Sequence, residues 1–311
     1  MGSELPDDDS QPLYRFWQPR YWGIWLCVGI LRLNAFLPYR VQVAEGRALG
    51  WLLYHLLRGR RRIAATNIAL CFPEAMPAAR QELLREHFAS LGITLIEHGL
   101  AWWASDALVR RLVDLRGREN LERAMAGGRG VILLTGHFGA QEFSGRAFGL
   151  SCPTTAGFYR PSRNPLVDEI LRRLRKKSAP ILIPKQAVRR VVRALRQGMP
   201  VWYAPDQSYR RAQSALIPFF GEPAMTTTAL SELVRLGKAA VVPLFPTRLP
   251  NGAGYRLDIL PALENFPGAS PEADARRVNE IIEAHIRTVP EQYYWLHRRF
   301  KGRPEGYPDP Y

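Results

Sequence analysis

Short apolar runs alternate with amphipathic helical segments through most of this chain, and this alternation restricts its fold more than any other feature. Runs typical of buried strands cover residues 130–135, 154–159, 180–183, 200–204, 239–245 and 255–260. Helical periodicity marks residues 76–103, 140–149, 164–177, 187–198, 226–237 and 271–289. This order predicts an α/β protein with a layered, mostly parallel or mixed central sheet flanked by helices.

Residues 21–38 are the most apolar stretch, and they predict an N-terminal membrane-anchoring helix. A helix of this length reaches roughly 27 Å, just short of a bilayer core of roughly 30 Å. Arg32 lies off centre, and Tyr21, Trp22 and Trp25 cluster at one end, where aromatic side chains favour the membrane interface. We expect the helix either to span the membrane or to lie in its interface. The alternative is a buried helix of a soluble protein.

Positive charge dominates the chain, with 43 Lys and Arg against 28 Asp and Glu and a formal net charge of +15. Such a charge favours anionic partners such as lipid headgroups, nucleic acid or an acidic protein. Arginines are more frequent after the apolar stretch than before it, which places the bulk of a spanning protein in the cytoplasm. Residues 41–64 predict a second helix with a basic end that lies on the membrane surface, or else an ordinary solvated charge run.

The cysteines and the N-terminus carry little chemistry of their own. The three cysteines, Cys27, Cys71 and Cys152, are too far apart for a CxxC motif. They therefore predict neither a disulfide framework nor a zinc site, and they favour a reducing compartment. Residues 1–19 begin with an acidic, proline-containing stretch and predict a flexible arm.

Polar clusters follow three of the predicted strands. They are GHFGAQE after 130–135, YRPSRN after 154–159 and PDQSYRR after 200–204. Ligands of α/β sheets bind at the carboxyl ends of the strands, so these clusters are expected to converge on one site.

His137 and Glu142 in the first cluster predict a catalytic dyad. The spacing is not HExxH, and neither a GxSxG elbow nor a GxxxxGK[ST] loop is present, so we expect no metal and no cofactor. Glu142 in the first turn of the next helix can hold one imidazole nitrogen while the other takes a proton. No Ser or Cys fits as nucleophile, which leaves a hydroxyl of a bound substrate. The alternative is a histidine that stabilises a strand-to-helix turn.

The GHFGAQE segment resembles the H-x4-D/E box of glycerolipid-type acyltransferases. More closely, the chain is similar to the late acyltransferases of lipid A biosynthesis, the lauroyl/myristoyl transferase family. The further matches, in order, are residues 60–74, 158–175, 205–208, 217–243 and 290–306. Two loops depart from the family pattern: Ala140-Gln141 replaces Asn-Trp, and SYRRAQSA follows Asp206-Gln207 in place of a glycine-rich stretch.

The resemblance implies a membrane-bound O-acyltransferase of the bacterial inner membrane, with its catalytic domain on the cytoplasmic side. It would move a fatty acyl chain from acyl carrier protein to a hydroxyl of an acyl chain on a lipid A precursor. The division that follows is an arm at 1–19, anchor and interfacial helices at 20–60, and an acyltransferase domain at 61–311. The expected partners are acyl carrier protein, the lipid A precursor and anionic membrane lipids, but not nucleic acid.

The same resemblance assigns roles to residues outside the dyad. Arg160 is expected to stabilise the oxyanion or to bind a phosphate. The remaining substrate-binding residues are Arg163, Asn164, Asp206 and Gln207, and the phosphate contacts are His297 and Arg298. The structural alternatives are a helix cap for Asn164, a turn role for Asp206, a salt bridge for Arg160, and plain solvation for His297 and Arg298. Basic helical segments at 172–177 and 189–196 are either docking faces for the acidic carrier protein or ordinary solvated helix faces. Acceptors such as a mannosylated phosphoinositide or an ornithine lipid, or a basic membrane-binding or nucleic-acid-binding protein without catalysis, are the alternatives in function.

Overall fold

The computed structural model describes residues 11–159, 161–184, 186–208 and 212–311. Its helices are α1 Trp22–Asn34, α2 Tyr39–Leu56, α3 Arg58–Cys71, α4 Pro77–Trp103, α5 Asp106–Leu112, α6 Arg118–Met125, α7 Gln141–Ser151, α8 Pro165–Arg175, α9 Val188–Arg196, α10 Ala229–Gly237 and α11 Pro271–Thr288. Its strands are β1 Val113–Arg116, β2 Val131–Leu134, β3 Ala156–Tyr159, β4 Ile181–Pro184, β5 Pro200–Tyr203, β6 Ser214–Phe219, β7 Glu222–Thr227, β8 Ala240–Arg248 and β9 Tyr255–Ile259.

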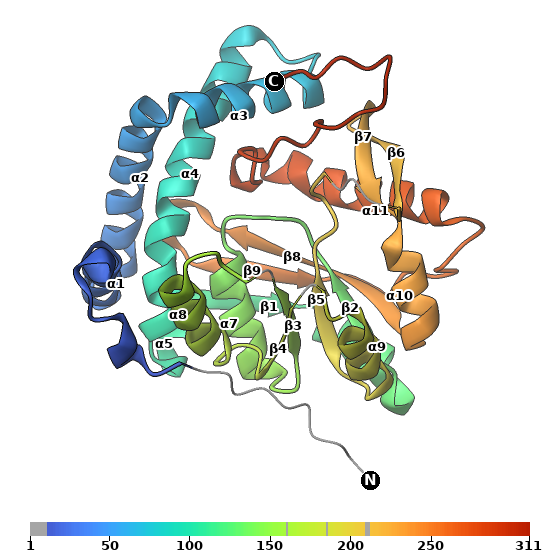
Figure 1. The fold of residues 1–311 in the computed structure, drawn as a ribbon, viewed down its shortest axis with the longest axis horizontal. Coiled ribbons are helices and arrows are strands. Elements are labelled where there is room, and N and C mark those ends of the chain that lie inside the picture. Colours follow the sequence, from blue (N-terminus) through green and yellow to red (C-terminus); the bar gives the residue numbers. More distant parts are fainter. Residues whose placement is uncertain (1–10, 160, 185, 209–211) are drawn as a thin grey trace.

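The central sheet has seven strands in the order β1-β9-β8-β2-β5-β3-β4 (Figure 1). From β8 to β4 every neighbouring pair is parallel, whereas β8 and β9 are antiparallel. The predicted mostly parallel or mixed sheet is therefore confirmed, as are all its predicted strands. The prediction missed β1, and it missed the separate β6–β7 hairpin, whose second strand takes the first residues of the predicted helix at 226–237.

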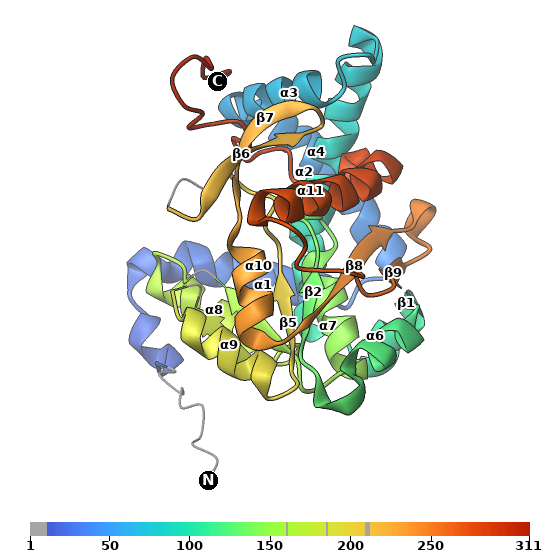
Figure 2. The same ribbon diagram turned by 90° about the vertical axis from the view of Figure 1, so that its right-hand side faces the viewer.

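The alternating side chains of β2 place this strand between two helical layers. Val131 and Leu133 pack on one face with residues of α6 and α7. Ile132 and Leu134 pack on the other face with residues of α9, α10 and α11. Figure 2 shows these two groups of helices on opposite sides of the strands. β2 is therefore buried on both faces. The residues that follow its carboxyl end pass directly from the core to the edge of the sheet.

The N-terminal helices differ from the prediction in length. The apolar segment at 21–38 forms α1, which has 13 residues. Within the described part of the chain, no helix combines the length and the apolar character that crossing a bilayer requires. The predicted spanning helix is therefore not supported. The predicted second helix is divided at Leu57, whose φ of −89° and ψ of 53° separate α2 from α3.

Residues 11–19 of the predicted flexible arm are held against α8. Phe16 is buried in a cluster with Leu166 and Ile170. The backbone amide of Gln11 donates to Glu169 Oε2 at 3.1 Å, which fixes the start of this segment. The predicted division between residues 60 and 61 falls within α3, so no break in secondary structure marks it.

Glycines allow α2 and α4 to cross at close range. A Cβ on Gly50 would lie 2.2 Å from the carbonyl oxygen of Phe88, and one on Gly92 would lie 2.1 Å from that of Gly46. Side chains at these positions would separate the two backbones. The glycines therefore hold α2 directly on α4, while the opposite face of α2 points away from the sheet (Figure 1).

Candidate active site

The loop that follows β2 carries His137 to the carboxyl edge of the sheet. The backbone amide of Thr135 still donates to the carbonyl of Tyr203 at 3.0 Å, and the chain leaves the sheet immediately afterwards. Asp206 follows β5, the strand directly beside β2. Two polar clusters that are far apart in sequence therefore meet at one place, as the order of the strands requires.

His137 and Asp206 form a doubly bonded pair. Oδ1 of Asp206 lies 2.6 Å from Nδ1 of His137, and Oδ2 accepts a hydrogen bond of 2.9 Å from the backbone amide of the same residue. The Asp206 side chain is 0% exposed, whereas 33% of the His137 side chain remains exposed. The imidazole is thus held at Nδ1, while a third of its side chain remains accessible.

The charges of this pair stabilise each other. Burial disfavours the imidazolium, but the Asp206 carboxylate outweighs this effect and raises the pKa of His137. Burial also opposes ionisation of Asp206, yet His137 and the nearby Tyr293 hydroxyl lower the pKa of that carboxyl to about 2. Asp206 is therefore ionised throughout the physiological range, and it favours the protonated form of His137.

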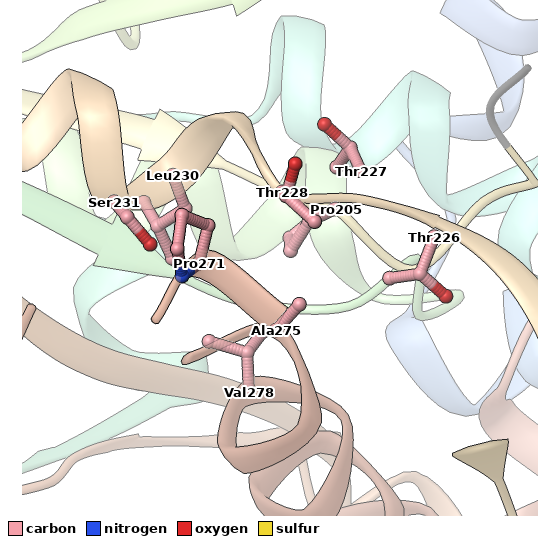
Figure 3. A pocket seen from close by; sticks show the side chains of 9 residues that line it. All are labelled: Pro205, Thr226, Thr227, Thr228, Leu230, Ser231, Pro271, Ala275 and Val278. Carbon is pink, nitrogen blue, oxygen red and sulfur yellow. The ribbon is translucent and has the colours of Figure 1, made fainter. Parts of the chain in front are cut away.

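The loop that carries Asp206 packs closely against the start of α10 and against α11. Pro205 lines a cavity of about 10 Å³ together with Thr228 and residues of α11 such as Ala275 (Figure 3). A cavity needs about 10–15 Å³ to hold a single water molecule, so no substrate group fits there. Rigid packing at Pro205 fixes the direction of the neighbouring carboxylate.

The His137 loop is joined to the C-terminal part of the chain. Phe138 forms an antiparallel bridge with Tyr293. The amide of Gly139 donates to the carbonyl of Gln292, and the amide of Tyr294 donates to that of His137, both at 2.9 Å. A Cβ on Gly139 would lie 2.4 Å from Thr94 Oγ1. The close neighbour of this glycine is therefore a protein side chain, which leaves no room for a Cβ.

A buried ion pair lies beside this contact between the His137 loop and the C-terminal part of the chain. Arg248 on β8 donates to Glu97 on α4, with Nε and Nη2 each 2.6 Å from a carboxylate oxygen. The Gln292 side chain accepts from the amide of Arg248 at 2.8 Å and donates to its carbonyl at 3.0 Å. No motif in the sequence predicts that Tyr293, Gln292 and this ion pair support the site, since their spacing carries no recognisable pattern.

Glu142 does not take the position that we predicted for it. It lies in the first turn of α7, and its carboxylate forms an ion pair with Arg175 on α8, with the Arg175 Nε 2.9 Å from Oε1. Burial raises the pKa of Glu142, but the charge of Arg175 exceeds that effect and leaves the pKa lowered. The carboxylate on Nδ1 of His137 is that of Asp206. The catalytic role of Glu142 itself stays a prediction.

The other predicted substrate residues surround the start of α8 and the end of β5. Asn164 caps α8, because its Oδ1 accepts from the amides of Leu166 and Val167 at 3.1 and 3.3 Å. Arg163 is exposed beside it, and Gln207 is half-buried next to Asp206. Arg160 lies outside the described residues. Contact of these residues with substrate stays a prediction.

The two predicted phosphate contacts have different surroundings. Nε2 of His297 accepts from the amide of Ser208 at 3.1 Å. Burial and the charges of Lys301 and Arg299 lower the pKa of His297 to about 4, so it is neutral at physiological pH and brings no charge to a phosphate. Arg298 is exposed, with its guanidinium carbon 5.7 Å from the centre of the Tyr311 ring.

The arrangement suits proton transfer. In its neutral form, with the Nδ1 proton donated to Asp206, His137 presents an unprotonated Nε2 that can accept a proton from a hydroxyl. Among the residues that the structure describes, no three His, Cys, Asp or Glu side chains gather as metal ligands. Our expectation that the site uses no metal or cofactor stays a prediction.

Comparison with known proteins agrees with this chemistry. Residues 11–302 match the family described as bacterial lipid A biosynthesis acyltransferase. The lipid A biosynthesis palmitoleoyltransferase of Escherichia coli (strain K12) is 41% identical over 94% of this chain and 95% of that protein. The lauroyltransferase of the same organism is 39% identical over 94% and 96%, and its myristoyltransferase is 29% identical over 99% and 94%. The chain is therefore an acyltransferase, and it belongs to the bacterial lipid A biosynthesis acyltransferase family.

Proposed function

We propose that this enzyme moves a fatty acyl chain from acyl carrier protein to a hydroxyl of an acyl chain on a lipid A precursor. The observation that carries the proposal is the buried Asp206 carboxylate on Nδ1 of His137, at the carboxyl edge of the sheet. A histidine held in this way is suited to activate a hydroxyl. The names of the relatives at 39–41% identity support a lipid A precursor as the acceptor.

His137 acts as the general base in the proposed reaction. Its Nε2 takes the proton of the acceptor hydroxyl while the oxygen attacks the carbonyl carbon of the thioester. The imidazolium that forms is stabilised by the carboxylate of Asp206, which stays ionised because its pKa is lowered. Collapse of the tetrahedral intermediate breaks the carbon–sulfur bond, and the imidazolium returns its proton to the carrier thiolate. The products are an ester and a free thiol, so atoms and charges balance.

The tetrahedral intermediate carries an oxyanion that needs a hydrogen-bond donor. Arg160 is our proposed donor, from its place in the sequence after β3. Loss of one such donor costs about 10²–10³-fold in rate in other acyl-transfer enzymes. The planar guanidinium also suits a phosphate oxygen, which keeps phosphate binding open for this residue.

The surface supports a place at the cytoplasmic face of the bacterial inner membrane. Large apolar side chains are exposed on α1 and α2, including Leu26 at 66%, Leu33 at 71% and Trp51 at 67%. An interfacial helix places such side chains at the boundary between headgroups and acyl chains. On α9, the exposed arginines Arg189 and Arg193 offer a positive face to the acidic carrier protein.

Acyl transfer by the purified full chain tests the proposal. The enzyme in detergent micelles is mixed with acyl carrier protein thioester and a lipid A precursor, and the products are analysed by mass spectrometry. We expect one added acyl group with the wild type and a loss of about 10²–10⁴-fold in rate with His137→Ala. A folded His137→Ala variant with wild-type turnover would show that the base is another group.

Parallel reactions test the acceptor and the donor separately. A mannosylated phosphoinositide and an ornithine lipid replace the lipid A precursor, and acyl coenzyme A replaces the carrier thioester. Faster acylation of either alternative lipid would overturn the proposed acceptor. Equal rates with coenzyme A would overturn the requirement for carrier protein.

A further inference from the structure

A pocket of about 670 Å³ opens where α2 ends and α3 begins. Its walls include the apolar side chains of Leu56 and Leu57 and the basic side chains of Arg58, Arg60 and Arg298. We call it the α2–α3 pocket. It combines three guanidinium groups with exposed hydrocarbon, and none of its lining residues is acidic.

The three arginines of the α2–α3 pocket have no carboxylate partner within the described part of the chain. Arg60 donates one long hydrogen bond, of 3.4 Å, to the carbonyl of Leu296. The neighbouring Arg61 behaves differently, because it donates to the carbonyl of Tyr54 at 2.9 Å and lies 4.6 Å from the centre of its ring. The charges that line the pocket are thus available to an external anion. A guanidinium binds phosphate oxygens through two parallel hydrogen bonds, which makes phosphate the best-matched anion.

The apolar wall of the α2–α3 pocket favours a phosphate that carries hydrocarbon. Leu56 is 65% exposed and Leu57 is 37% exposed at the pocket itself. Trp51 and Leu52, one turn earlier on α2, are 67% and 44% exposed. A soluble phosphate leaves this surface in water, whereas a lipid phosphate places its hydrocarbon against it. The pocket therefore fits an amphiphile with an anionic headgroup.

Hydrogen bonds join α3, which lines one side of the α2–α3 pocket, to the C-terminal segment beside the catalytic pair. Asn67 on α3 donates from Nδ2 to the carbonyls of Trp295 and His297, each at 2.7 Å. His297 in turn accepts from the amide of Ser208, two residues after Asp206. Arg298 follows His297 directly, so its side chain enters the pocket from the segment that borders the catalytic pair.

We propose that the α2–α3 pocket binds a phosphate of the acceptor lipid and so positions the acceptor hydroxyl at His137. This proposal rests on the proposed function, since it takes a phosphorylated lipid as the acceptor. The acyl chains of that lipid lie along the exposed face of α2. Bulk anionic phospholipid shares the same phosphate chemistry, and the experiment below separates the two sources.

Charge removal in the pocket tests the proposal in the full-length enzyme. The double variant Arg58→Gln/Arg298→Gln is compared with Arg111→Gln, an exposed arginine on α5 that lies outside the pocket. We expect the acceptor KM of the double variant to rise at least about 10-fold, which corresponds to the loss of about 1.4 kcal/mol. The KM for the carrier thioester and kcat should change little, and Arg111→Gln should match the wild type.

An acceptor without phosphate identifies the ligand group. With a dephosphorylated lipid A precursor, the wild type and the double variant should have the same acceptor KM. An equal rise with both acceptors, together with weaker binding to phosphatidylglycerol vesicles, would assign the pocket to bulk phospholipid and overturn the proposal. An unchanged KM with the phosphorylated acceptor would also overturn it.

Equilibrium binding keeps this test independent of turnover. The wild type and the double variant are titrated with phosphorylated lipid A precursor in detergent micelles. If the wild type binds this lipid about 10-fold more tightly than the double variant but does not acylate it, the proposed function fails while the phosphate site stands. Equal affinities of the two proteins would reject the phosphate site whatever the activity.

Discussion

The imidazole of His137 lies beside a fully buried carboxylate, and this sets the pH range in which the imidazole can accept a proton. Only the neutral imidazole can accept a proton, and the Asp206 charge raises the pKa of His137 above its ordinary value. We therefore expect kcat/KM to fall as the pH drops through this raised pKa. The acidic limb of the profile should lie above about 6.5, the value of an isolated histidine.

Asp206→Asn should change both the rate and the pH profile. The substitution removes the charge that raises the pKa of His137 and leaves the burial that lowers it. We expect the acidic limb to move to lower pH, and the rate at neutral pH to fall by about 10²–10⁴-fold as the orientation of the base is lost. Steady-state kinetics between pH 5 and 9 would measure both effects. An unshifted limb would contradict the pairing of the two residues.

The same pair makes stability depend on pH in opposite directions. Asp206 has a lowered pKa, so its contribution is present above its unfolded pKa and is lost as the pH falls through about 2. His137 has a raised pKa, so its contribution is present below its unfolded pKa and is lost as the pH rises through the folded value. We expect the stabilisation from the pair to be largest in mildly acidic solution. Urea unfolding of the wild type and Asp206→Asn at several pH values would show it.

Glu142→Gln should affect stability more than the titration of the base. The variant leaves the partly buried Arg175 without its carboxylate, and we expect a loss of about 1–3 kcal/mol in the free energy of unfolding. The acidic limb of kcat/KM should stay where it is in the wild type, because Asp206 still holds Nδ1 of His137. A limb that moves as it does in Asp206→Asn would show that Glu142 acts through the imidazole.

The prediction that His137 follows a buried strand is confirmed, but the carboxylate on its imidazole is Asp206 and not Glu142. The apolar run and the glycines place the histidine just beyond a strand, and this depends only on local pattern. The partner depends on which strand lies beside β2 in the sheet, and that is β5 rather than the next strand in sequence. The pairing of β2 with β5 brings Asp206 next to His137, and the local sequence does not show which strands pair.

At the scale of elements, substitution of one glycine by alanine tests whether α2 and α4 need glycines where they cross. In Gly50→Ala the added carbon would lie 2.2 Å from the backbone oxygen of Phe88, so the helices must move apart. Overpacking of this kind costs about 1–3 kcal/mol. Thermal and urea unfolding would measure the loss.

Gly145→Ala on α7 is the matched control for this crossing. A Cβ at Gly145 meets nothing within 4 Å, so the change only improves helix propensity, by up to about 1 kcal/mol. If both variants are equally stable, close contact does not decide the position of α2.

Elements with regular periodicity were predictable, and those set by tertiary contact were not. The parallel strands and α7 to α11 follow their apolar patterns closely. β1 was missed because it has only four residues, in which two charged side chains alternate with two apolar ones. The strand is defined by its pairing with β9, which the local sequence does not reveal. The break at Leu57 was missed because neither proline nor glycine stands at that residue.

At the scale of the whole molecule, exposed apolar side chains gather on α1 and α2, on the side of α4 away from the sheet (Figure 1). The double variant Leu26→Gln/Trp51→Gln removes two of them. Burial of one large apolar side chain contributes about 1.5–3 kcal/mol, so vesicle binding should weaken at least about 10-fold. Co-sedimentation with phosphatidylglycerol-containing vesicles would measure the change.

Leu236→Gln is the control for this surface. Leu236 is 42% exposed on α10, at the other side of the molecule in Figure 1. We expect its vesicle binding to equal that of the wild type. Equal binding of all three proteins would show that the outer face of α1 and α2 does not contact lipid.

The bridge between Phe138 and Tyr293 also sets an order of events during synthesis. The ribosome releases α1 and α2 first, and the histidine loop follows well before Gln292 and Tyr293 exist. Until those residues are translated, the loop lacks the backbone partners that hold it, and Asp206 lacks the Tyr293 hydroxyl. In a nascent chain the candidate site therefore stays incomplete until the segment that carries Gln292 and Tyr293 has been translated and has folded onto the histidine loop.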